Sequence, residues 1–452
     1  MVNRKTAAPR GTLSTTDGIV LVIGMMVGIG IFATPALVAQ FSGSGFNYLI
    51  CWLLGGLLTL IGALCYAELA TTFPDAGGEY HFLSRAYGKS VGLMFAWARC
   101  SVIQTGAIAL VAFVYGDYAQ AVLPLGVYGP AIHAAIAVTL FTGINVAGTA
   151  QGKLAQQIFT ATDVAALLLI VAAGLVFAFS TGAPAISMPV PAPADTRYGL
   201  MGLAMVFVLL TYGGWNEASY ISAELRGGTR AMVRVLVVSV TFVTIIYFLV
   251  GATYLYVLGF EKLRQSQAVA AEVMSAAFGP WGATVLSVCV CGAAVSTLNA
   301  TIFTGARVFY ALGRDLPALR VFGIWSARGE NPANAFILQG AIALALIGLG
   351  ALMRDGFKAM VEYTSPVFWL FMTLVGVSIF IFRRREPDRL RPYRVPFYPV
   401  FPIIFIGTCL WMLYSSLVYT GTGALFGVIV LALGVPLLLM GRASRPAADL
   451  AE

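Results

Sequence analysis

The sequence predicts an all-α polytopic membrane protein, and three properties of the chain support this prediction. Of its 452 residues, 59% are hydrophobic and only 10% are charged, whereas a soluble domain has about 25% charged residues on average. Apolar runs of about 20 residues, the length that a helix needs to cross ~30 Å of hydrocarbon, recur along the whole chain. The basic residues gather in the short loops between these runs. Such a chain needs lipid as its outer solvent.

Glycine, proline and charged residues divide the apolar runs into separate expected helices. The sequence predicts twelve spans, at residues 16–40, 47–70, 91–120, 127–148, 155–179, 199–225, 232–258, 281–310, 334–353, 359–382, 398–418 and 422–441. Between the seventh and eighth spans, residues 261–279 have the composition of a short amphipathic helix lying over one face. Tails at residues 1–15 and 442–452 complete the chain.

Lysine and arginine determine the expected orientation, because short cytoplasmic loops carry an excess of them. With twelve spans and a cytoplasmic N-terminus, 21 of the 27 basic residues fall inside, five fall outside, and Arg99 lies within the third span. This asymmetry predicts a multi-pass protein of the cell membrane, plasma or inner, with both termini cytoplasmic. It also explains the net charge of +8 without a nucleic-acid partner.

The cysteines and histidines suggest no chemistry of their own. The six cysteines lie mainly inside apolar runs without the spacing of metal ligands, so we interpret them as packing residues. None lies in an expected outer loop, which argues against a disulfide-linked partner subunit. An enzyme would need catalytic groups clustered at an interface, and the two histidines lie far apart in the sequence. We therefore expect no enzyme, cofactor or metal site.

Two spans carry glycine clusters at the expected middle of the membrane. The first contains GMMVGIG at residues 24–30, and the sixth contains YGGWN at residues 212–216. Glycine costs about 1 kcal/mol relative to alanine in a helix, although a single cluster would equally suit close helix packing. Because the clusters lie five spans apart, an odd number, the two halves of the chain that they begin would cross the membrane in opposite directions. These halves are residues 16–179 and 199–382, and residues 398–441 lie outside both. Broken helices in corresponding positions are typical of an inverted-repeat transporter with its site at the midplane.

An opened helix leaves backbone groups that lipid cannot satisfy. The N–H groups of Gly28, Ile29 and Gly30 would begin a half-helix, where the helix dipole favours a carboxylate. Carbonyls near Ile23 and at residues 210–212 would end the preceding half-helices and accept from an ammonium group. The two breaks therefore predict a site for the constant part of a zwitterionic amino acid.

Five longer stretches are distributed over nearly the whole chain: VGIGIFATP, FPDAGGEYHFLSRAYG, TYGGWNEASYISAEL, LNATIFTGARVFYALGRD and RPYRVPFYPVFPIIFI. In this order they resemble the amino acid–polyamine–organocation (APC) superfamily, and within it the L-type amino acid transporter-like permeases. The resemblance implies the LeuT fold, with ten core helices in two inverted five-helix repeats, helices 1 and 6 unwound, and two further helices. It also implies amino acid uptake or exchange by alternating access.

Matched by position, the resemblance implies a set of substrate-binding residues on the two breaks. The set places the carboxylate at Gly28, Ile29 and Gly30, and the amino group near Ile23, Leu210 and Asn216, with Tyr212, Gly213, Gly214 and Trp215 beside them. The family's gating aromatic often stands where this chain has Leu210, so gating falls to Tyr212 or Trp215, or the pocket is more open. Trp215 either lines the pocket or packs, and Gln104 either lines it or is a satisfied buried amide.

The fifth span departs from the family pattern. Many members carry a lysine within Thr-x-x-Lys, where the ammonium group occupies the place of a sodium ion, but this chain has aspartate at position 163. A lone carboxylate near mid-membrane costs about 2.5–3.5 kcal/mol on insertion scales. Either Asp163 forms an H⁺ or Na⁺ coupling site with the hydroxyls of Ser296 and Thr297, or it is a structural ion pair or a protonated, hydrogen-bonded group.

The leading hypothesis is a secondary active transporter or exchanger for amino acids. A transporter-like amino acid sensor and a polyamine or amine permease of the same fold are the alternatives, whereas a channel would need a pore-lining ring repeated by symmetry. The sequence offers no fixed carboxylate for a cationic side chain unless Glu217 faces the pocket; in the other interpretation, Glu217 pairs across the cytoplasmic half with Arg99. A neutral amino acid is therefore favoured.

Overall fold

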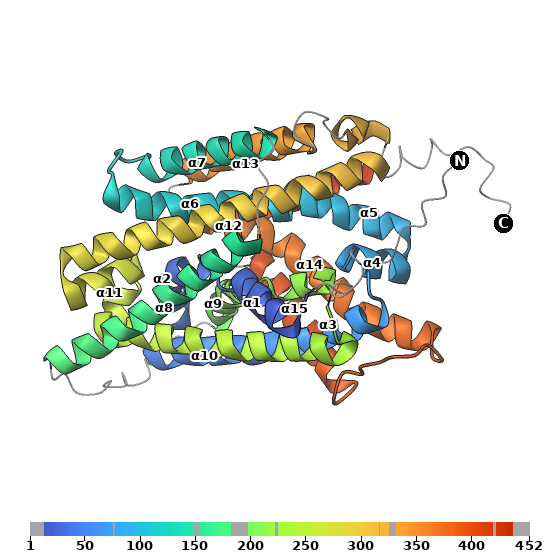
Figure 1. The fold of residues 1–452 in the computed structure, drawn as a ribbon, viewed down its shortest axis with the longest axis horizontal. Helices are drawn as coiled ribbons and strands as arrows, with labels where there is room; N and C mark the ends of the chain where they lie inside the picture. Colours follow the sequence, from blue (N-terminus) through green and yellow to red (C-terminus); the bar gives the residue numbers. More distant parts are fainter. Residues whose placement is uncertain are drawn as a thin grey trace.

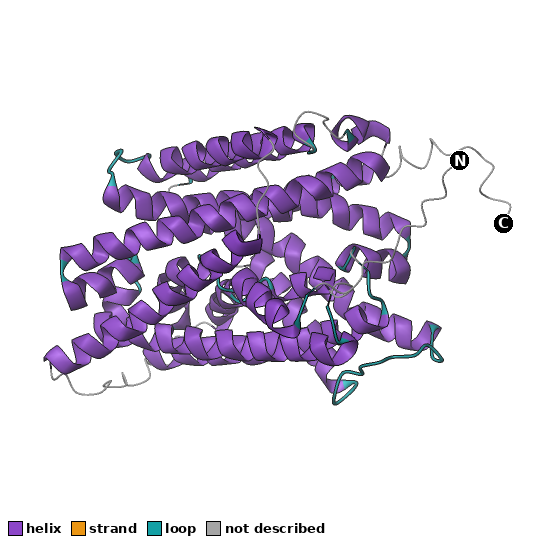
Figure 2. Cartoon of the chain, viewed as in Figure 1, coloured by secondary structure: helices purple, strands orange, loops and turns teal. Residues whose placement is uncertain are grey.

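A computed structural model of the chain describes residues 13–75, 77–147, 153–181, 198–221, 225–315, 317–324, 331–353, 355–418 and 422–436. Within these residues the regular elements are helices (Figure 2), apart from one isolated bridge between Leu13 and Leu225. Most of the two expected tails lies outside the described residues.

In the first half of the chain, the described residues form eight α-helices and one π-helical segment, η1. Their bounds are α1 Thr15–Met26, α2 Gly30–Ser42, α3 Gly45–Thr72, α4 Glu79–Tyr87, α5 Lys89–Ala98, η1 Arg99–Gln104, α6 Thr105–Val122, α7 Gly129–Ala147 and α8 Lys153–Thr181. The second half adds α9 Tyr198–Thr211, η2 Trp215–Ile221, α10 Gly228–Leu263, α11 Val269–Phe278, α12 Pro280–Asp315, η3 Pro317–Gly323, α13 Ala333–Leu352, α14 Gly356–Arg385, α15 Val400–Val418 and α16 Thr422–Ala432.

Nine helical stretches in the described part are long and apolar enough to cross a membrane, and the bent pair α1–α2 makes a tenth. The expected sixth and twelfth spans correspond to the shorter apolar helices α9 and α16. The short helix expected between the seventh and eighth spans is confirmed as α11. The protein is thus an all-helical, multi-pass membrane protein.

Both expected breaks are present. The helix α1 ends at Met26, α2 begins at Gly30, and their axes differ by 48°. The helix α9 ends at Thr211, and a turn at residues 212–214 leads into the short 3-10 helix η2. Gly214 in this turn has a φ of 99°, a conformation that a residue with a Cβ rarely adopts.

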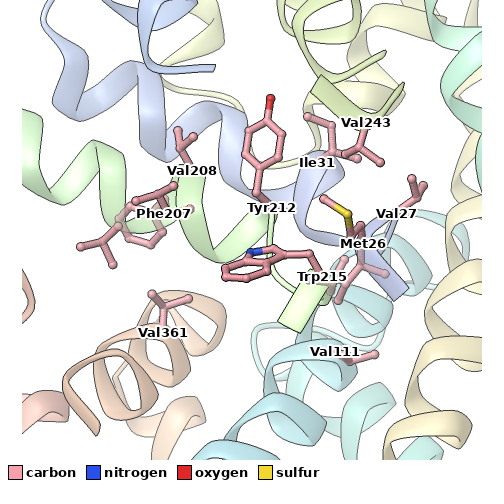
Figure 3. Packing of buried hydrophobic residues seen from close by; sticks show 14 of the residues in the cluster. Met26, Val27, Ile31, Val111, Phe207, Val208, Tyr212, Trp215, Val243 and Val361 are labelled. Atoms are coloured by element: carbon pink, nitrogen blue, oxygen red, sulfur yellow. The ribbon is translucent and has the colours of Figure 1, made fainter. Parts of the chain in front are cut away.

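The broken helices lie in the interior of the bundle (Figure 1). The helix α2 packs on α9, and α1 packs on α8 and α10. A pair formed by α3 and α10 lies along one side of the bundle, while α6 and α12 separate the broken helices from α7 and α13 on the other (Figure 1). Met26, Val27, Tyr212 and Trp215, from the two breaks, belong to one buried hydrophobic cluster (Figure 3). The breaks therefore meet inside the protein, away from lipid.

The short helix α4 lies in a stretch that the sequence analysis did not assign to a helix. It docks on α14 through two hydrogen bonds, from the Tyr87 hydroxyl to the Leu374 carbonyl at 2.7 Å and from the Arg385 guanidinium to the Ala86 carbonyl at 2.9 Å. This docking holds the C-terminal end of α4, and Glu79 begins the helix at its other end.

Candidate functional site

A cavity of about 450 Å³ lies where the two breaks meet, within the size range of small-molecule sites. The first break contributes Gly28 to its wall, and the second contributes Gly214 and Asn216. The third span adds residues from α5 to α6, including the π-helical segment, and α8, α12 and α14 close the remaining sides. Among the described residues the cavity is therefore bounded by six spans, two of which are interrupted helices.

Half of the predicted site residues line this cavity. They are Gly28, Gln104, Asp163, Gly214, Asn216, Ser296 and Thr297. The other predicted residues lie behind the wall, on the same two breaks or on the helices that lead into them: Ile23, Ile29, Gly30, Leu210, Tyr212, Gly213 and Trp215.

The N-terminus of α2 leaves two backbone donors free, directly after Gly28 in the cavity wall. The Gly28 N–H donates to the Met26 carbonyl at 2.9 Å, but no described group accepts the N–H of Ile29 or Gly30. A methyl group built on Gly28 would meet no atom within 4 Å. Free N–H groups at a helix start form a ready anion site, and the open space at Gly28 lets an anion approach the backbone.

The carbonyls at the ends of α1 and α9 are largely satisfied within the protein. The Ile23 carbonyl accepts the Val27 N–H at 2.6 Å, and the Leu210 carbonyl accepts the Gly213 N–H at 3.0 Å. The buried Tyr247 hydroxyl on α10 donates to the Met26 carbonyl at 2.8 Å. Tyr247 therefore supports the end of the first half-helix, a role that its position in an ordinary apolar run did not indicate.

We expect Tyr247→Phe to lower the thermal stability of the detergent-solubilised protein. The variant removes one of two described donors to the Met26 carbonyl, which keeps the Gly28 N–H, and a typical hydrogen bond contributes about 0.5–1.5 kcal/mol. The Tm of Tyr247→Phe, compared with that of Tyr128→Phe, which removes an exposed hydroxyl, measures this effect. Equal Tm values for the two variants would show that the Tyr247 hydroxyl does not hold the end of α1.

The two aromatic residues of the second break pack behind the cavity. The Trp215 ring lies edge-on to Tyr66, with ring centroids 4.8 Å apart, and the Tyr212 hydroxyl donates to the Trp52 carbonyl at 2.9 Å. Trp215 thus has the packing position that was one of its two interpretations. Gln104 meets both of its interpretations, since it lines the cavity and its amide donates to the Thr301 carbonyl at 2.9 Å.

A cluster of charged groups forms one end of the cavity. The Arg99 guanidinium donates to Glu79 at 3.2 Å and to Glu217 at 2.7 Å, so the expected pairing of Arg99 with Glu217 is confirmed. The Glu79 carboxylate also accepts from the Tyr66 hydroxyl at 2.8 Å and from the Asn216 amide at 3.0 Å. Burial raises the pKa of Glu79 while Arg99 beside it opposes this shift. Its oxygens act only as acceptors in these bonds, as those of an ionised carboxylate do.

Glu79 is the residue of this cluster that the sequence analysis missed. It connects three parts of the protein, because α4 carries Glu79, η1 carries Arg99, and the second break carries Asn216. A local signal was present in the pair of glycines before Glu79, where Gly78 has a φ of 48°. That turn directs the start of α4 inward and buries Glu79, which is only 4% exposed.

Asp163 lies on α8 in the wall of the same cavity as Ser296 and Thr297 of α12. It is only 5% exposed, and its Oδ1 has no hydrogen-bond partner among the residues that the structure describes. No described basic residue forms an ion pair with it. The structural ion pair that was one interpretation of Asp163 is thus not found in this part of the chain.

Comparison with known proteins adds independent information. The model of the family described as amino acid permease matches residues 13–436. The b(0,+)-type amino acid transporter 1 of Mus musculus is 30% identical over 420 residues, covering 92% of this chain and 84% of its own length. The same transporter of Homo sapiens is 31% identical over 87% of this chain and 80% of its own length. The large neutral amino acids transporter small subunit 2 of Mus musculus is 27% identical over 93% and 79%, respectively.

Proposed function

Because the chain belongs to the amino acid permease family, and within the APC superfamily to the L-type amino acid transporter-like permeases, we propose that it is a secondary active transporter or exchanger of amino acids that works by alternating access. The observation that carries the proposal is the junction of the two breaks. There, the N–H groups of Ile29 and Gly30, which have no acceptor among the described residues, begin α2 directly after Gly28 in the wall of a cavity of about 450 Å³. A substrate carboxylate would accept hydrogen bonds from these N–H groups.

The arrangement of helices supports the LeuT fold with twelve transmembrane helices and two inverted repeats. The broken pair α1–α2 corresponds to α9–η2, α3 to α10, and the long third span to α12. A short helix precedes the long span in both halves, α4 in the first and α11 in the second. By the same correspondence α7 matches α13 and α8 matches α14, while α15 and α16 follow the repeats.

Two cavities that share no lining residue support alternating access. The first is lined by α1 but not by α2, and by residues 95–107 of the third span, whose N-terminal end is expected in the cytoplasm. A second cavity of about 1280 Å³ is lined by α2, α6 and α7, together with the loops before α11 and α14. If the protein lies in a cell membrane with both termini on the cytoplasmic side, the first cavity faces the cytoplasm and the second faces the outside. This arrangement corresponds to an inward-facing state in which the layer between the two cavities is closed.

The coupling part of the proposal rests on Asp163. A buried carboxylate without a basic partner is costly unless a proton or a cation neutralises it. Asp163, Ser296 and Thr297 supply one carboxylate and two hydroxyl oxygens to one wall of the cavity. Oxygen ligands of this kind suit either Na⁺ or a titrating proton, so we propose that Asp163 couples substrate movement to one of these ions.

We expect the purified protein in proteoliposomes to take up labelled amino acids with saturation and to show counterflow. Counterflow arises because a carrier crosses the membrane more readily with substrate bound than without it, so that unlabelled substrate on one side drives labelled substrate in from the other. Neither a channel nor an enzyme shows this behaviour. Uptake should be measured for a panel of competing amino acids at two pH values, with and without sodium. Binding without flux would indicate a sensor instead, and flux of amines but not of amino acids would indicate an amine permease.

A further inference from the structure

Glu217 stands at the start of η2, on the wall of the cavity that forms between the breaks. One carboxylate oxygen, Oε1, accepts from Arg99 at 2.7 Å, and this is its only side-chain partner among the described residues. Its side chain is 35% exposed, whereas the side chain of Glu79 in the same cluster is 5% exposed. Glu217 therefore keeps one oxygen available to a molecule in the cavity.

The charges in this end of the cavity do not balance. Arg99 is the only basic residue in the described cavity wall, and it contacts both Glu79 and Glu217. Two carboxylates and one guanidinium leave a formal charge of −1. Glu79 is saturated by Tyr66, Asn216 and Arg99, so the unbalanced charge resides at Glu217, where a cation in the cavity would neutralise it.

The uncharged polar groups nearby can offer mainly hydrogen-bond acceptors to a ligand in the cavity. The Thr301 hydroxyl donates its proton to the Thr297 carbonyl at 2.7 Å, and the Thr304 hydroxyl donates to the Ala300 carbonyl at 3.0 Å. The Gln104 amide nitrogen donates to the Thr301 carbonyl, and its oxygen accepts from no described residue. Because the donor hydrogens of these groups are already used, the lone pairs of the Thr301 hydroxyl and of the Gln104 oxygen remain for a ligand, whereas the Thr304 hydroxyl also accepts from the Gln104 amide at 3.4 Å.

Apart from Asp163, Ser296 and Thr297, most of the remaining wall is apolar. Phe95 and Ile103 of the third span, together with Phe368, Phe371 and Met372 of α14, line the same cavity. A side chain that combines a hydrocarbon stem with a terminal cation matches such a surface, because the stem contacts the apolar residues while the cation reaches the acceptors. A purely aliphatic side chain would leave the Glu217 oxygen without a partner.

We propose that Glu217 is a specificity-determining residue, which selects amino acids with a basic side chain over neutral ones of the same length. This inference rests on the proposed function, because it assigns the side-chain end of a substrate whose carboxylate binds at α2. It also changes the expectation of a neutral substrate, which held only if Glu217 faced away from the pocket.

Lysine and norleucine provide a matched test, because norleucine has the stem of lysine without the terminal ammonium group. In proteoliposomes containing the wild-type protein, lysine should compete with labelled substrate at a lower concentration than norleucine. A hydrogen bond to a charged group contributes about 1.5–3 kcal/mol, so we expect Glu217→Gln to reduce the lysine-to-norleucine affinity ratio by about tenfold to a hundredfold. Glutamine can still accept from Arg99, so norleucine transport should persist.

Glu261→Gln is the matched control, since it makes the same change at a side chain that is 70% exposed outside this cavity. A ratio in Glu217→Gln equal to that of Glu261→Gln would overturn the inference. A wild-type protein that carries norleucine and excludes lysine would also overturn it, while leaving the proposed function intact. This wild-type comparison decides the question even where Glu217→Gln does not fold. Transport of neither compound, nor of any other amino acid in the panel, would contradict the proposed function itself.

Discussion

Asp163→Asn should abolish the dependence of uptake on a proton or sodium gradient. Asparagine is neutral, so the variant no longer needs a proton or a cation at this position. In the wild-type protein, a carboxylate that is 5% exposed and lacks a described basic partner requires one of them. Because the amide keeps the shape of the side chain, amino acid exchange should continue while accumulation against a gradient stops.

The measurement is uptake into proteoliposomes with an imposed pH gradient or sodium gradient, compared with exchange at equal concentrations on both sides. The gradient that stimulates the wild-type protein identifies the coupling ion. Asp388→Asn makes the same substitution in an exposed loop and should retain the wild-type response. Gradient-driven accumulation that is unchanged in Asp163→Asn would show that Asp163 is structural.

The two breaks were predictable from sequence because their cause is local. Glycine weakens a helix wherever it occurs, and the clusters at residues 24–30 and 212–216 lie in otherwise strongly apolar runs. The outcome matches this cause, since α1 ends at Met26 and the positive φ of Gly214 follows the end of α9. The short helix α11 was likewise visible in local composition.

The side of each break that faces the cavity was not predictable. Residues 210–216 form a helix end, a tight turn and the start of a 3-10 helix, and consecutive residues in such a segment point in different directions. Gly214 and Asn216 reach the cavity, whereas the side chains of Tyr212 and Trp215 pack behind it. A family motif identifies the segment as a whole, and only the packing of α3 and α10 against it decides which side chains turn inward.

Contacts between distant segments explain the residues that were missed. Glu79 acquires its role from Arg99 and Asn216, and Tyr247 acquires its role from the Met26 carbonyl. The π-helical segment Arg99–Gln104 widens the third span locally, and such segments often occur at functional sites. Neither Tyr247 nor the π-helical segment changes the hydropathy or the periodicity of its own segment, and the glycines before Glu79 indicate a turn but not the partners of the carboxylate.

Gly28→Ala should give a folded protein that has lost most of its uptake. The added methyl group would meet no protein atom within 4 Å, so the packing around it is unchanged. It would instead take up the open space at the first break, where the carboxylate of the substrate is proposed to bind. Losing hydrogen bonds to a charged group at about 1.5–3 kcal/mol each predicts at least a tenfold fall in uptake at low substrate concentration.

Gly143→Ala and Gly214→Ala are the controls for Gly28→Ala. The first tests the effect of an added methyl group away from the breaks, and the second tests the effect of a loss of stability. Gly143 also has open space around it, but it lies on an exposed face of α7, so its variant should transport as the wild-type protein does. A methyl group on Gly214 would overlap the Met25 carbonyl, at a φ of 99° that alanine rarely adopts, so this variant should lose Tm as well as uptake. Gly28→Ala should keep the wild-type Tm while its uptake falls. Full uptake in Gly28→Ala would mean that the substrate carboxylate does not bind at the first break.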